Sequence, residues 1–249
     1  MEYKTSFKTF VKEGVEKGFF IGTGNPNSKI LLIGKESAID KSNNDCQNWY
    51  FKNAKEWETH IEKSTTECFS YYVDEKNCLR KNWGKNTWSK YQLLSNSIWN
   101  KETEKYSIDF LESIFTTEIN DSPAKKTSLA NKSGIDERKL LFKNSAFIQE
   151  FPVIVLACSN YIKNNNELRE IDEIFNVTYD GDEKGKYWFN KGNWFFTHHN
   201  FENSKLVIHT RQLSADVNNS MLEKMGEVIR QHLIRLENFN ARNANKGCS

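Results

Sequence analysis

The chain has 249 residues, a net charge of +2 and 13% aromatic residues. Acids and bases nearly balance, which excludes a globally basic nucleic-acid-binding protein and leaves only a local basic surface. Five cysteines without a CxxC pair exclude a disulfide framework or zinc ribbon and predict a reducing compartment. No apolar run is long enough to span a bilayer, and residues 1–10 lack the apolar core of a signal peptide. We therefore expect a cytoplasmic protein with one domain over 1–249.

The amino-terminal part of the chain predicts a helix followed by a buried strand. Apolar residues at helical spacing predict a helix over 5–19. A turn-rich stretch at 22–27 precedes the apolar run 29–34, which is typical of a strand buried on both faces. Residues 40–86 are polar and aromatic-rich, and we interpret them as an insertion with one helix near 54–63.

Three further apolar runs predict strands, at 113–119, 151–158 and 205–209. Helical stretches separate or follow them, at 86–100, 136–150, 161–175 and 215–236, with a frayed tail after 238. Strands alternating with helices predict an α/β protein. The expected fold is a three-layer α/β/α sandwich around a four-stranded, mainly parallel central sheet. The aromatic segments 187–189 and 194–196 predict a small hairpin, which either serves DNA binding or only covers the sheet.

Chemically useful side chains follow the predicted strands, where ligands of open parallel sheets bind. Glu36, Glu118 and His209 stand at three strand ends. Two carboxylates and a histidine can support acid–base or electrostatic catalysis on one ligand, although strand ends are also simply polar. The glycines of 22–24 and Gly34 complete neither a dinucleotide-binding motif nor a P-loop.

Four segments in order resemble the uracil-DNA glycosylase superfamily. The turn Gly24-Asn-Pro-Asn27 and its strand resemble the beginning of the first strand, and Phe115-Thr-Thr-Glu118 resembles the second block. Val153-Ile-Val-Leu-Ala-Cys158 is similar to the third strand. Val207-Ile-His209 with a serine-containing loop resembles the last block. The resemblance covers about 24–236 and implies a DNA glycosylase. The four-cysteine iron–sulfur pattern of one branch is absent, so no cofactor is expected.

The resemblance places the catalytic loop at Gly34-Lys35-Glu36-Ser37-Ala38. Glu36 falls where one version of the family has its catalytic aspartate, and His209 matches the family histidine. The position that reads the pyrimidine, usually asparagine, is Glu118. An ionised Glu118 only accepts hydrogen bonds, whereas asparagine also donates them, so the change favours a base with an exocyclic amino group.

The implied mechanism begins with a base flipped out of the stack. Glu36 stabilises the developing charge on the sugar or activates a water, and His209 donates a hydrogen bond to the leaving base. The expected substrate-binding residues are Gly34, Lys35, Ser37, Trp49, Tyr50, Phe51, Glu118 and Asn120. The expected DNA-binding residues are Arg211, Gln212, Leu213 and Ser214. One of the three aromatics either stacks on the base or packs in the core, and Leu213 either wedges into DNA or staples a helix.

The leading hypothesis is a hydrolase that cleaves the N-glycosidic bond of a non-standard or amino-bearing base in single- or double-stranded DNA, acting as a monomer. The alternative is a non-catalytic nucleic-acid- or partner-binding module, which Lys35 and Glu118 favour because they break the family motif. A third is a small-molecule hydrolase acting on nucleosides. No metal is expected, since His198 and His199 are adjacent and point to opposite faces of a strand. The pairs Lys125-Lys126 and Arg138-Lys139 either contact phosphates or form ordinary charged surface.

Overall fold

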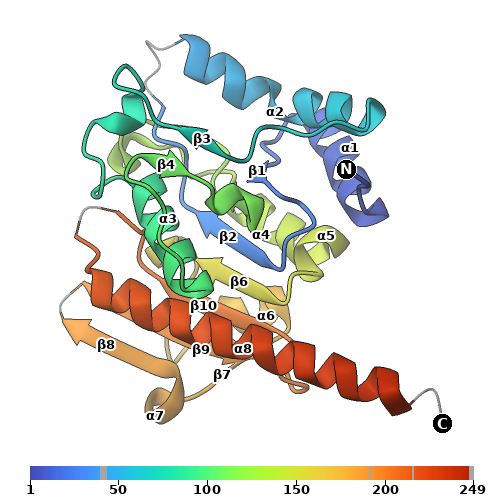
Figure 1. Ribbon diagram of the computed structural model, residues 1–249, viewed down its shortest axis with the longest axis vertical. Helices are drawn as coiled ribbons and strands as arrows, with labels where there is room; N and C mark the ends of the chain where they lie inside the picture. The colour runs from blue at the N-terminus through green and yellow to red at the C-terminus, as the bar shows by residue number, and fades with distance from the viewer. Residues whose placement is uncertain (40–43, 191, 215, 247–249) are drawn as a thin grey trace.

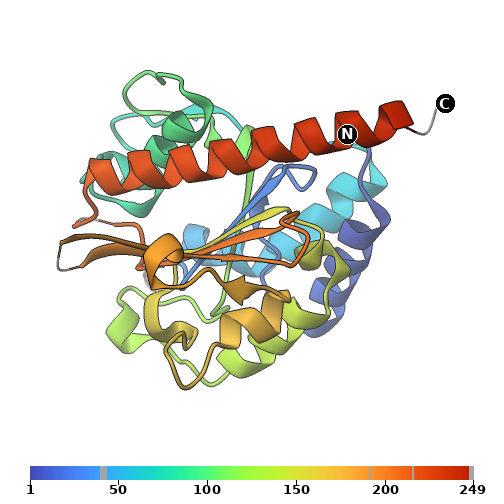
Figure 2. The ribbon, with the colours of Figure 1, turned by 90° about the horizontal axis from the view of Figure 1, so that it is seen from below.

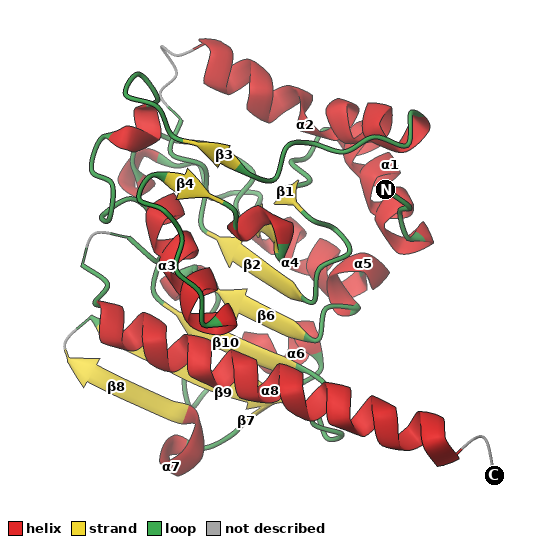
Figure 3. Cartoon of the chain, viewed as in Figure 1, coloured by secondary structure: helices red, strands yellow, loops and turns green. Residues whose placement is uncertain are grey.

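The computed structural model describes residues 1–39, 44–190, 192–214 and 216–246. Its centre is a mixed eight-stranded sheet (Figures 1 and 3). In spatial order the strands are β1 (Thr23–Gly24), β5 (Ile114–Glu118), β2 (Ile30–Gly34), β6 (Val153–Leu156), β10 (Leu206–Thr210), β9 (Asn193–His199) and β7 (Thr178–Tyr179), with β8 (Lys186–Asn190) paired to β9.

The four strands predicted from apolar runs form the parallel middle of this sheet, β5-β2-β6-β10. The predicted number of strands is wrong, because β1, β7, β8 and β9 extend the sheet through antiparallel pairing. The α/β class is confirmed. A separate pair, β3 (Tyr71–Tyr72) and β4 (Ser107–Ile108), lies in the region between α2 (Asn44–Glu62) and β5.

Two hydrophobic cores lie on the two faces of the sheet, because successive side chains of a strand point to opposite sides. In β2, Leu31 and Ile33 join one core and Ile30 and Leu32 join the other. Helices α1 (Thr5–Lys17), α2, α4 (Ile135–Asn144), α5 (Ala146–Gln149) and α6 (Glu170–Phe175) pack against the first core. Helices α3 (Thr87–Trp99) and α8 (Asn219–Lys246) pack against the second (Figure 2).

Several helix boundaries differ from those predicted. Helix α8 continues to Lys246, ten residues beyond the predicted helix end at 236. The stretch 161–175 is helical only from Glu170, because the preceding Asn164–Asn166 segment closes a turn through Asn165, whose side chain accepts from the amides of Glu167 and Leu168. The helix near 54–63 begins ten residues earlier, at Asn44.

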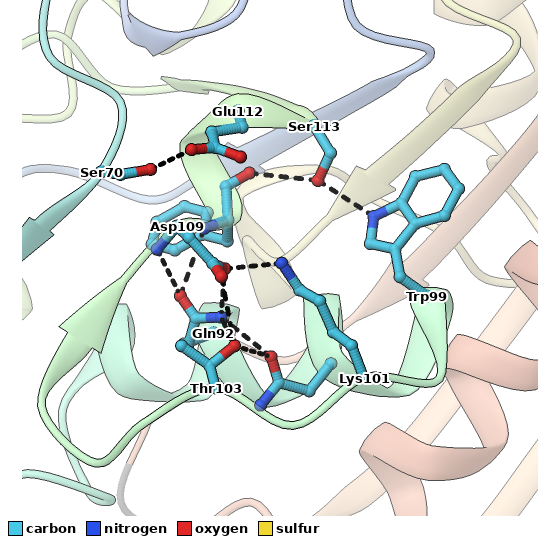
Figure 4. A network of polar contacts seen from close by, with 10 residues as sticks. Ser70, Gln92, Trp99, Lys101, Thr103, Asp109, Glu112 and Ser113 are labelled. Atoms are coloured by element: carbon cyan, nitrogen blue, oxygen red, sulfur yellow. Dashed lines mark hydrogen bonds and ion pairs between the residues drawn. The ribbon is translucent and has the colours of Figure 1, made fainter.

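A polar network fixes the connection from α3 to β5 (Figure 4). The Gln92 side-chain carbonyl accepts from the amides of Asp109 and Phe110 at 2.9 and 3.2 Å, and its amide donates to Asp109 at 2.7 Å. Lys101 forms an ion pair with the same carboxylate at 2.7 Å. These contacts hold the segment before β5, and thus help set where Glu118 ends that strand.

Among the helices of the described residues, none combines the length and apolar character needed to cross a bilayer.

Candidate functional site

The direction of the chain changes between β2 and β6. From β2 the chain continues to β5 on one side, whereas from β6 it continues to β10 on the other. In open α/β sheets, ligands bind at this switch point beyond the carboxyl ends of the strands. The loop 35–38 and the turn Ser159–Tyr161 lie at these two strand ends. The predicted catalytic loop therefore stands at the position that the topology favours for a ligand.

Glu36 is held at this switch point by two hydroxyl groups. Its side chain is 7% exposed. Thr127 Oγ1 donates to Oε1 and the Tyr161 hydroxyl donates to Oε2, both at 2.6 Å. Burial, together with the hydrogen bond to Glu36, raises the pKa of Tyr161, so its hydroxyl stays a donor. Thr127 and Tyr161 are not among the predicted site residues, because they come from loops distant in sequence.

Lys35 is accompanied by two further cations, Lys132 and Arg211, and we call these three side chains the cation cluster. The Lys35 and Lys132 ammonium groups lie 5.0 and 5.4 Å from the centre of the Tyr161 ring. Burial lowers the pKa of Lys35, Glu36 opposes this, and repulsion from Lys132 and Arg211 lowers it further. Lys35 and Lys132 thus place two positive charges against the ring whose hydroxyl binds Glu36.

Glu118 ends β5 beside Gly34. Ser37 Oγ donates to its Oε1 at 2.7 Å, while its Oε2 is buried without a hydrogen-bond partner. Burial raises the pKa of Glu118 to about 7, against the lowering effect of the Ser37 hydrogen bond. Burial therefore works against the expected ionised form of Glu118 and favours a protonated carboxyl, which both donates and accepts hydrogen bonds.

The loops after β2 and β5 are joined by backbone hydrogen bonds. The amides of Asn120 and Ala124 donate to the carbonyls of Lys35 and Ser37 at 2.9 and 3.0 Å. Asn120 is predicted to bind substrate, but its amide group donates to the Asn131 carbonyl and accepts from the backbone N–H of Ser122. In this structure Asn120 thus closes the loop 120–131.

His209 ends β10 and is buried, with both ring nitrogens in contact with protein groups. Nε2 lies 2.9 Å from the Ser159 carbonyl, and Nδ1 lies 3.3 Å from the Asn164 side-chain amide. The same amide reaches His198 Nε2 at 3.3 Å, and His198 Nδ1 lies 2.6 Å from Asp172. A carbonyl only accepts, so Nε2 carries the proton and Nδ1 accepts from Asn164. Burial lowers the pKa of His209 to about 4, so the ring is neutral at neutral pH.

The predicted catalytic residues therefore form two groups. Glu36 and Glu118 lie at the ends of β2 and β5, and the charge of Glu36 helps raise the pKa of Glu118. His209 lies against the turn after β6, through Ser159. Among the described residues, the contacts of His209 reach this turn and the aromatic strand β9 and neither carboxylate. Residues 159–161 join the groups, since Tyr161 binds Glu36.

The three predicted base-stacking aromatics lie on α2 and differ in exposure. Trp49 and Phe51 are exposed, whereas Tyr50 is buried and stacks on Phe20 with ring centres 4.4 Å apart. Tyr50 therefore takes the core-packing alternative. Phe51 lines a cavity of about 360 Å³ beside the loops after β2 and β5. The other lining residues are Ile39, Asp121, Ser122, Pro123, Leu129 and Asn131.

The loop after His209 differs from the predicted DNA wedge. Leu213 has no exposed surface and packs in the core beneath α8, so it is not available here as a wedge. Arg211 Nη1 donates to the Gly192 carbonyl at 2.9 Å, and the Ser214 carbonyl accepts from Val217 before α8. Gln212 is half-exposed.

The expectation for the second basic pair, Arg138-Lys139, is also corrected. Arg138 is buried rather than available to phosphate, and its guanidinium donates to the carbonyls of Phe20 and Glu118 at 2.6 and 3.0 Å. Lys139 pairs with Glu170 at 2.9 Å. Both side chains therefore serve the fold, since they connect α4 to the strand ends and to α6.

Within the described ranges, no group of three or more histidine, cysteine, aspartate or glutamate side chains is placed to hold a metal ion. Comparisons of this chain with protein-family models, with curated proteins and with solved structures find no match.

Proposed function

We propose that the chain is a DNA glycosylase-like hydrolase, built as a three-layer α/β/α sandwich of the uracil-DNA glycosylase type, that cleaves the N-glycosidic bond of a flipped base. The observation that carries the proposal is Glu36. A buried carboxylate, oriented by Thr127 and Tyr161, stands at the switch point beside three cations. Such a group suits stabilisation of an oxocarbenium-like sugar or activation of a water, while the cations suit phosphate.

In this proposal His209 is the donor to the leaving base. It is neutral and carries its proton on Nε2, which suits donation to a base that gains negative charge. The donor is engaged with the Ser159 carbonyl, so the leaving base takes the place of that carbonyl as its partner, while Tyr161 stays bound to Glu36. Asn164 keeps the tautomer by donating to Nδ1.

Glu118 reads the base in this proposal, and its proton decides what it recognises. The ionised form accepts from an exocyclic amino group, and the protonated form also donates to a carbonyl. A pKa of about 7 makes both forms accessible. The substrate is then a non-standard or amino-bearing base whose preference over other bases depends on pH.

The second candidate is a non-catalytic nucleic-acid- or partner-binding module on the same fold. One observation favours it: both oxygens of Glu36 and both ring nitrogens of His209 are engaged within the protein. A polar group that is satisfied internally costs free energy to redirect to a ligand.

The test is base release from single- and double-stranded oligonucleotides carrying altered bases, followed by alkali cleavage at abasic sites. We expect release, and a loss of about 100-fold or more in Glu36→Gln, comparable to the loss of a key electrostatic group. Glu223→Gln, at an exposed position of α8, is the matched control and keeps activity. Oligonucleotide binding without release of any base would reject the enzyme and support the module.

A further inference from the structure

The hairpin of β8 and β9 has an aromatic face that the sheet leaves uncovered. Trp188 pairs directly with Trp194 across the hairpin, so both rings lie on one face, and Phe196 follows two residues later on the same face. Trp188 is 60% exposed, and the other two are half-buried. We call Trp188, Trp194 and Phe196 the aromatic platform. Figure 1 places this hairpin at the edge of the sheet away from α1.

The opposite face of the hairpin is an ordinary core face. Tyr187, Phe189 and Phe195 pack against the core beneath α8, and the centres of the stacked Tyr187 and Phe195 rings are 4.3 Å apart. One aromatic face is thus enough to anchor the hairpin to the protein. The platform adds large rings on the second face, and the most exposed of them, Trp188, gains little from burial there.

The platform continues directly to the candidate site. The rings of Trp194 and Phe196 lie 5.2 Å apart, and they lie 5.3 and 6.3 Å from the His209 ring. A row of rings therefore runs from the exposed edge of the sheet to the end of β10. Beside Phe196 is a cavity of about 180 Å³ lined partly by Asn164, the residue that holds His209.

Cations flank the row. Lys186 pairs with Phe196 across the hairpin and so lies on the platform face. The Arg169 guanidinium lies 4.2 Å from the Tyr179 ring, which is itself 5.9 Å from Phe196. Arg211, of the cation cluster, donates to the hairpin turn at Gly192. The acidic partners of Lys186 and Arg211 are exposed, so these ion pairs are weak and open to exchange.

We propose that the aromatic platform binds an unpaired nucleic-acid strand, whose bases stack on its rings and whose phosphates meet the flanking cations. Aromatic rings beside a cationic track are the means by which proteins bind single strands without reading sequence. The inference rests on the proposed function in expecting nucleic acid, and it extends it by naming a single-stranded substrate that enters past the hairpin.

The test is fluorescence anisotropy with a fluorescein-labelled 12-nucleotide oligothymidylate that contains no altered base. Trp188→Ala should weaken binding by about 5-fold to 150-fold, the range found for loss of one base-stacking ring. Trp188→Phe retains a ring and should recover most of the affinity. The matched control is Phe201→Ala, a fully exposed aromatic after the opposite end of β9, which should bind as the wild type does. Circular dichroism checks that each variant is folded.

Salt dependence tests the cations separately. Lys186→Gln should reduce the slope of log affinity against log salt by about 0.7, the value for one phosphate contact on a single strand. Equal affinity of wild type and Trp188→Ala for the oligonucleotide would overturn the platform. It would also be overturned if light scattering showed a dimeric wild type and a monomeric Trp188→Ala variant that bind DNA equally well. The two proposals fail separately. Binding that depends on Trp188, without release of any base, refutes the glycosylase and keeps the platform. Base release together with binding that does not depend on Trp188 refutes the platform and keeps the glycosylase.

Discussion

Replacing Glu118 by glutamine should remove a loss of stability that the wild-type protein shows as pH rises. The carboxyl has a pKa of about 7 in the fold, because burial disfavours its charge, against 4.5 in the unfolded chain. For an acid whose pKa is raised by folding, the stabilisation is fully present below pH 4.5 and is lost as pH rises through about 7. Glutamine has no charge to bury, so Glu118→Gln removes this loss.

The size of the effect follows from the two pKa values. At 1.36 kcal/mol per pH unit, the difference between 4.5 and about 7 corresponds to about 3 kcal/mol. Partial solvent contact of the side chain makes this an upper limit. Between pH 5 and pH 8 the free energy of unfolding of Glu118→Gln should gain about 2 kcal/mol relative to wild type. Ser37 keeps its acceptor in the variant, since glutamine offers a carbonyl oxygen.

The assay is urea unfolding followed by tryptophan fluorescence at pH 5, 6, 7 and 8. Every other titrating group is shared, so the difference between variant and wild type isolates Glu118. Glu223→Gln, at an exposed position, should show a difference that does not change with pH. If the difference in free energy of unfolding between Glu118→Gln and wild type did not change with pH, the raised pKa would be refuted. The proposal that the protonated and ionised forms of Glu118 recognise different bases would fail with it.

Two further predictions concern buried groups that the sequence leaves open. Arg138→Ala should lower the free energy of unfolding by about 3–5 kcal/mol, because it leaves buried carbonyls unpaired. The control Lys143→Ala, at an exposed position of the same helix, should change it by no more than about 0.5 kcal/mol. Urea titration measures both variants, and similar values would contradict the role given to Arg138. Burial raises the pKa of the Cys158 thiol to about 12, whereas Cys68 and Cys78 are exposed. Iodoacetamide should therefore label Cys68 and Cys78 in the folded protein and Cys158 only after unfolding, as measured by peptide mass mapping. Labelling of Cys158 under native conditions would count against its burial.

The sequence by itself determined the parallel centre of the sheet and the position of the candidate site. Strands β2 and β6 are short runs of buried apolar residues, a pattern typical of strands covered on both faces. The loop after β2 could therefore be identified as a ligand position before the fold was known. The strands β1 and β7 could not be identified from the sequence, because each has only two residues and so carries no periodic pattern.

Only the tertiary structure decided what the site residues do. Glu36 acquires its orientation from Thr127 and Tyr161, which lie 91 and 125 residues further along the chain. The proton on Glu118 and the burial of Leu213 likewise depend on segments folded over them. Local sequence specifies backbone periodicity, but a side chain's charge, exposure and partners are set by whichever distant groups pack around it.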